Sequence, residues 1–64
     1  MFDEKPYQRL INRLQFLTVS KEIAPDCRRL ARNCYQRMMS ASPDRDAMAY
    51  AKTEAEEFLE AWGL

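Results

Sequence analysis

The stretch that decides the fold is SPDRDAMAYAKTEAEEFLEAW, residues 42–62. Its apolar residues follow at alternating steps of three and four, with Leu59 beside the series: Met48, Ala51, Ala55, Phe58 and Trp62. This spacing is the a/d pattern with which a helix buries one face against other helices. We expect Ser42 to cap the free backbone N–H groups, with Pro43 in the first helical position. The sequence therefore predicts a helix over approximately residues 43–62, stopped by Gly63.

Two further segments upstream carry the same helical period. The first is expected over approximately residues 6–19, with Pro6 suited to its first turn. Its apolar face is formed by Tyr7, Leu10, Ile11, Leu14, Leu17 and Thr18. The second is expected over residues 25–40 and begins at Pro25, with the inner stripe Cys27, Leu30, Ala31, Cys34 and Met38. Whether the linker of residues 20–24 is helical stays open.

The fold class predicted from these segments is all-α. Residues 1–64 are expected to form a single domain, a small three-helix bundle or a helical array. The connections are short, so neighbouring helices should run antiparallel. A chain of this length buries only about 60% of the surface that its unfolded form exposes. We therefore expect added support from self-association, as a homodimer.

The two cysteines do not supply that support. Cys27 and Cys34 are seven residues apart, which separates them by about 10 Å along one helix, whereas a disulfide needs Cα atoms within about 7 Å. With no histidine in the chain, two thiols do not make a zinc site. We interpret both as small buried apolar residues, and we expect no metal and no cofactor.

Catalysis and membrane insertion are both disfavoured by the composition. The chain has no histidine and one glycine, so the usual general base and a glycine-rich phosphate loop are missing, and we expect no enzyme. No apolar run approaches the roughly 20 residues of a membrane span. The first six residues contain no apolar stretch typical of a secretory signal. A cytoplasmic protein with reduced thiols is expected.

Charge is divided unevenly along the chain. Residues 1–42 carry eight Lys or Arg against four Asp or Glu, a balance of +4, and residues 43–64 carry two against six, a balance of −4. On a helical wheel one stripe of the second segment contains Arg28, Arg32, Tyr35 and Met39. A stripe of the third segment contains Tyr50, Glu54 and Glu57. A purely structural interpretation is that the two stripes face each other, with surface ion pairs that contribute about 0–1 kcal/mol each.

The functional interpretation makes the first of these stripes a binding surface. Aromatic residues, Met and Arg are the types enriched at protein interfaces. Our hypothesis is a small non-catalytic protein-binding module, which regulates another protein as an adaptor, accessory factor or inhibitor. The residues expected to contact the partner protein are Arg28, Arg32, Tyr35 and Met39.

The alternative is an accessory protein that binds RNA or DNA. Its phosphate contacts would come from Arg9, Arg13, Arg28 and Arg32. The net charge of zero argues against it, because nucleic-acid modules usually carry a basic balance. A helix-turn-helix reading also fails, since the third segment, which would be the recognition helix, is acidic.

Several apolar residues lie outside the helical seams, and three of them are expected to complete the core or a dimer seam: Phe2, Phe16 and Ile23.

Overall fold

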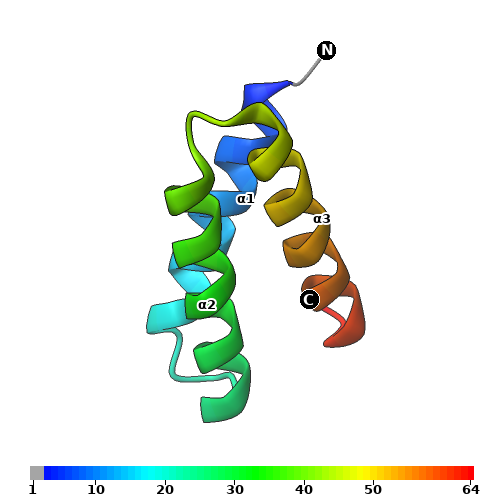
Figure 1. The fold of residues 1–64 in the computed structure, drawn as a ribbon. Coiled ribbons are helices and arrows are strands. Elements are labelled where there is room, and N and C mark those ends of the chain that lie inside the picture. The colour runs from blue at the N-terminus through cyan, green and yellow to red at the C-terminus, as the bar shows by residue number, and fades with distance from the viewer. Residues whose placement is uncertain (1–2) are drawn as a thin grey trace.

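The computed structural model describes residues 3–64, so Phe2 lies outside the described residues. The described chain forms three helices and contains no strand: α1 (Glu4–Val19), α2 (Pro25–Ala41) and α3 (Arg45–Ala61) (Figure 1). The predicted all-α three-helix bundle is confirmed. Each helix begins and ends within two residues of its predicted bounds.

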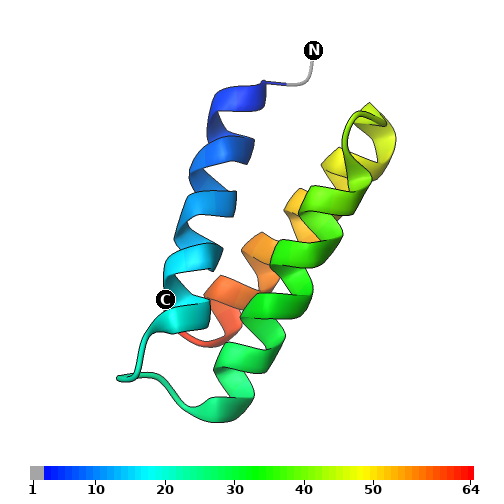
Figure 2. The same ribbon diagram turned by 90° about the vertical axis from the view of Figure 1, so that its left-hand side faces the viewer.

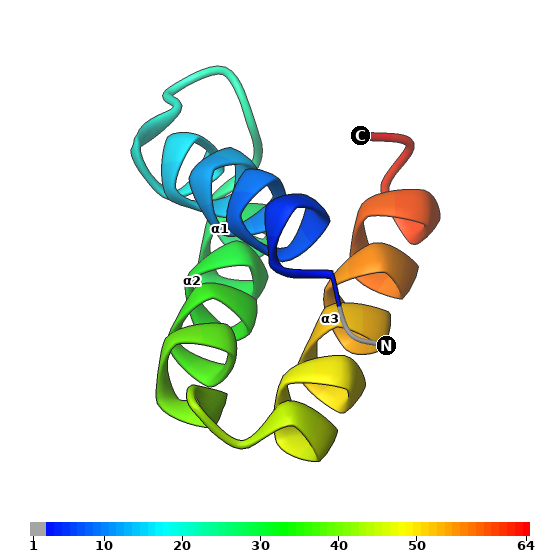
Figure 3. The same ribbon diagram turned by 90° about the horizontal axis from the view of Figure 1, so that it is seen from above.

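The central helix of the bundle is α2. It runs antiparallel to α1 and packs against both α1 and α3, whereas α1 and α3 touch each other little (Figure 2). Viewed from above, α1 and α2 overlap on one side of the molecule and α3 lies on the other (Figure 3). The bundle is therefore more open between α1 and α3 than along either side of α2.

Aspartates cap two of the helices. The Asp3 carboxylate accepts from the Lys5 N–H at the start of α1, and the Asp44 carboxylate accepts from the N–H groups of Asp46 (3.0 Å) and Ala47 (3.3 Å). The prediction that Ser42 caps the third helix was wrong, as was the placement of Pro43 inside it. Ser42 instead follows the last residue of α2, and Pro43 lies in the turn. Asp caps a helix as well as Ser does, and Asp44 satisfies two N–H groups.

The remaining helix boundaries follow local rules. Pro25 occupies the first turn of α2, as expected. Gly63 stops α3, with a positive φ of 69°. Its N–H donates to Glu60 O at 3.1 Å, and the N–H of Leu64 donates to Leu59 O at 2.8 Å. These two bonds form a Schellman motif, which supplies donors for the last carbonyls of the helix.

The core is built from the apolar stripes of all three helices. Its buried members are Tyr7, Ile11, Leu14, Leu17, Ala31, Met38, Met48, Ala51, Ala55 and Leu59. The Tyr7 hydroxyl donates to the backbone carbonyl of Met38, which joins the first half of α1 to the last turn of α2. Cys27 is buried, Cys34 is half-buried, and both are free thiols.

Three residues expected inside are exposed. Leu30 and Trp62 were placed in inner stripes, but their side chains are 41% and 44% exposed. Phe16 is 69% exposed, so it does not complete this core. Ile23 does pack against the core, from a linker that is not helical between Ser20 and Ala24. None of the described helices combines the length and apolar character needed to cross a membrane.

Candidate functional site

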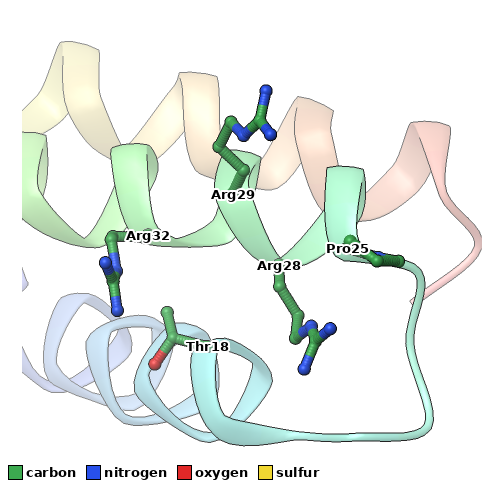
Figure 4. A pocket seen from close by; sticks show the side chains of 5 residues that line it. All are labelled: Thr18, Pro25, Arg28, Arg29 and Arg32. Carbon is green, nitrogen blue, oxygen red and sulfur yellow. The ribbon is translucent and has the colours of Figure 1, made fainter.

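A small hollow of about 310 Å³ lies where the end of α1 meets the start of α2 (Figure 4). Its lining comes from Thr18, Pro25, Arg28, Arg29 and Arg32. Arg28 and Arg32, one helical turn apart, extend toward α1 near Thr18, whereas Arg29 extends to the other side of α2 (Figure 4). The structure therefore brings together two of the four predicted binding residues, which we call the arginine pair.

The arginine pair has no acidic neighbour in this hollow. None of the lining residues is a carboxylate, and α1 carries no Asp or Glu after Glu4. Within residues 3–64 the ion pairs are Arg37–Glu54 and Lys52–Glu56, and neither involves the pair. The Thr18 hydroxyl donates to Gln15 O at 2.7 Å, so its hydrogen is already engaged in the helix. The hollow thus presents guanidinium donors with no carboxylate in its lining, although the Thr18 oxygen can still accept a hydrogen bond.

The other two predicted residues lie further along the same flank of α2. Met39 is 52% exposed and borders a second hollow with Glu4, Gln8 and Ser42. Tyr35 is half-buried and packs against the core, so it is less accessible than Met39. The four residues form a line along the α1 side of α2 and do not share one pocket.

The structural interpretation of the charge division was wrong in its pairing. The stripe of Arg28 and Arg32 lies toward α1, not toward α3 (Figure 4). The residue of α2 that meets α3 is Arg37, whose guanidinium pairs with Glu54. Arg37 lies on the opposite flank of α2 from Arg28 and Arg32. Its pair with Glu54 is the one ion pair between two helices within residues 3–64.

The residues proposed for nucleic-acid binding do not form one surface. Arg9 and Arg13 border a hollow of about 240 Å³ between α1 and α3, together with Lys52 and Glu56. The arginine pair borders the other flank of α1. A nucleic acid would have to pass around the outside of α1 to contact both groups.

A surface that the sequence did not indicate lies between α2 and α3. Its exposed or half-buried apolar residues are Leu30, Phe58 and Trp62, which border a hollow of about 500 Å³. Cys34 also lines it, and burial raises the pKa of this thiol, with Arg37 lowering it and Glu54 raising it to a smaller extent. One feature of the sequence could have indicated this surface: Leu30 lies at the edge of the apolar stripe on its helical wheel, although we assigned it to the inner stripe.

These features define a small all-α three-helix bundle with unpaired arginines and exposed apolar residues. Among the described residues no three His, Cys, Asp or Glu side chains gather in a way that could hold a metal ion. Comparison of the chain with protein-family models, with curated proteins and with solved structures gave no match. The argument about function therefore depends on the surface of the bundle itself.

Proposed function

We propose that this chain is a small non-catalytic protein-binding module, an adaptor, accessory factor or inhibitor, that binds its partner through the α1 side of α2. The observation that carries the proposal is the arginine pair, Arg28 and Arg32, side by side without a carboxylate. Guanidinium groups bind carboxylates in bidentate geometry. The partner is therefore a protein that presents Asp or Glu side chains to this hollow.

Met39 supports an apolar contact on the same flank. Its side chain is half exposed, unbranched and adaptable, as is common on protein-binding surfaces. Tyr35 lies between Met39 and the arginine pair and contributes the edge that its partial burial leaves accessible. An acidic segment with one apolar side chain fits this arrangement of charge and apolar surface.

The cellular setting proposed for the module is the cytoplasm. Both cysteines are free thiols, and Cys34 is only half-buried, which is compatible with a reducing compartment. The proposal includes no enzymatic activity, and the lining of the hollow contains no histidine or carboxylate that would act as a general base.

Two double charge reversals test the proposal. Arg28→Glu with Arg32→Glu inverts the arginine pair, and Arg9→Glu with Arg13→Glu makes the same change on the other flank of α1. Tagged wild type and both variants are used to retain partners from native lysate, with and without nuclease. We expect one stoichiometric protein, resistant to nuclease, lost in the first variant and kept in the second.

The nucleic-acid alternative gives a different result in the same experiment. Retention would vanish with nuclease, both variants would lose it, and the affinity for the nucleic acid would fall steeply with salt because of counterion release. A protein partner retained equally by wild type and by the Arg28→Glu, Arg32→Glu variant would show that the α1 side of α2 is not the binding surface.

A further inference from the structure

A groove runs between α2 and α3 on the side of the bundle that α1 does not cover. Two hollows of about 500 Å³ and about 530 Å³ adjoin at the Arg37–Glu54 ion pair, and their lining residues belong to α2, to α3 and to Trp62, which directly follows α3. Leu30, Phe58 and Trp62 line the first hollow. We call the two hollows together the α2–α3 groove.

The rim of the groove on α3 is acidic. Glu57 is exposed and borders the hollow that contains Phe58 and Trp62. Glu60, three residues later on the same helix, is also exposed. An apolar floor beside an acidic rim accommodates a helix that carries an apolar side chain flanked by arginines.

The chain itself presents such a helix face. Arg9, Arg13 and Phe16 follow one another at steps of four and three on one exposed face of α1, where Arg9 and Arg13 also border the hollow between α1 and α3. We call these three residues the α1 stripe. Phe16 is 69% exposed, and Val19, one turn later, is 71% exposed. Arg9 and Arg13 form no ion pair with any residue of 3–64.

The α1 stripe cannot meet the α2–α3 groove of its own chain. No residue of α1 lines the groove, whereas Arg9 and Arg13 border the hollow between α1 and α3 and Phe16 is exposed. The two surfaces are complementary in charge and in apolar character, and they lie on different sides of one molecule.

We propose that the α1 stripe of a second copy of this chain occupies the α2–α3 groove. Phe16 of the second copy packs at the Leu30, Phe58 and Trp62 end. Arg13 is three residues before Phe16, about 4.5 Å along the helix axis, which places its guanidinium next to Glu57. The groove thereby receives a fourth helix.

This contact joins two different surfaces, so it is heterologous. Every molecule offers both an α1 stripe and a groove, and the assembly grows head to tail into a ring or an open chain. The arginine pair at Arg28 and Arg32 takes no part in it, so the inference stands independently of the proposed function.

The assembly is tested by sedimentation velocity of the purified chain from micromolar to millimolar concentration. We expect wild-type oligomers that grow with concentration and shrink in high salt, which screens exposed charges. Arg13→Glu disables the stripe and Glu57→Arg disables the groove, so each variant alone should be monomeric. Arg45→Glu, an exposed reversal at the start of α3 outside both surfaces, should assemble like wild type.

Mixing the two disabled variants gives the sharpest result. The intact stripe of the Glu57→Arg chain can enter the intact groove of the Arg13→Glu chain, and growth then stops. We expect one complex containing a single copy of each, and its formation shows that both variants are folded. A monomeric wild type at all concentrations, or a mixture that stays monomeric, overturns the proposal. Wild-type-like assembly of Arg13→Glu, with loss in Glu57→Arg alone, would replace it with a symmetric groove-to-groove dimer.

Discussion

Replacing Tyr7 by phenylalanine removes the hydroxyl group that joins α1 to the end of α2. Tyr7 is 3% exposed, and its hydroxyl donates to the carbonyl of Met38. Met38 is one of the last four residues of α2, whose carbonyls have no donor in the ordinary helical ladder. A buried carbonyl deprived of its partner costs about 1–3 kcal/mol. Domains of this length have a total free energy of unfolding of about 3–10 kcal/mol. We therefore expect Tyr7→Phe to remove a large share of the free energy of unfolding.

The assay is urea unfolding followed by circular dichroism. We expect a lower midpoint with an unchanged m value, because the surface exposed on unfolding stays the same. Tyr50→Phe is the matched control, since Tyr50 is 71% exposed and makes no hydrogen bond within residues 3–64. Its unfolding free energy should stay within about 0.5 kcal/mol of wild type. Equal midpoints for the two variants would refute the role of the Tyr7 hydroxyl.

The same residue predicts a loss of stability at alkaline pH. Burial raises the pKa of Tyr7 above its ordinary value. For a group whose pKa is higher in the folded state, the contribution to stability is complete below the unfolded pKa, about 10 for tyrosine, and is lost as pH rises through the folded pKa. We expect the unfolding free energy of wild type to fall above about pH 10, and the fall to be smaller in Tyr7→Phe. Parallel pH profiles for the two chains would contradict this.

Two more predictions concern the start of α3 and the cysteine in the groove. Asp44→Ala should lower the unfolding free energy by about 0.5–2 kcal/mol, because the helix loses its cap. Ser42→Ala should change it by less than about 0.5 kcal/mol. If thermal melts show Ser42→Ala to be the more destabilising variant, Ser42 and not Asp44 is the cap. Because burial raises the pKa of the Cys34 thiol and the thiolate is the reactive form, Cys34 should react with a disulfide reagent far more slowly in the native chain than in urea. Arg37→Gln should slow it further, since Arg37 lowers that pKa. Equal rates in native and unfolded wild type would contradict the first expectation, and an unchanged or faster native rate in Arg37→Gln would contradict the second.

Local features of the sequence predicted the helices well. Gly63 was expected to stop the third helix, and it does so through its positive φ. The cap of that helix was misplaced because Ser42 and Asp44 lie two residues apart and both are good capping residues. Pro43 fits either assignment, since proline suits both a turn and a first helical turn. The choice between Ser42 and Asp44 as the cap depends on which side chain lies within hydrogen-bond distance of the free N–H groups, and the sequence alone does not show this.

Exposure of the apolar residues was harder to predict. A helical wheel gives the angle of a side chain around its own axis and does not show where neighbouring helices end. Leu30 lies near the start of α2 and Trp62 just beyond the end of α3, and both line the open groove between these helices. With α1 absent from the lining of that groove, the two side chains keep more than a third of their surface exposed.

The site itself depends on a choice that the wheel leaves open, the hand of the bundle. Once α1 and α2 form a hairpin, α3 can pack on either flank of α2 with the same apolar faces buried. The mirrored arrangement would place Arg28 and Arg32 next to α3, as the structural interpretation of the charges assumed, but it would also turn the Glu54 and Glu57 flank of α3 toward α1. In the observed arrangement α3 lies on the Arg37 flank.

That hand leaves the arginine pair beside α1, which carries no carboxylate after Glu4. The division of charge along the chain therefore becomes a division between surfaces, because the acidic helix is held on the far flank of α2 from two of its arginines. Under the proposed function, the partner supplies the carboxylates that the lining of the hollow does not provide to Arg28 and Arg32. The binding proposed for the arginine pair thus depends on the side of α2 on which α3 packs, because that side decides which arginines of α2 lie beside the acidic helix.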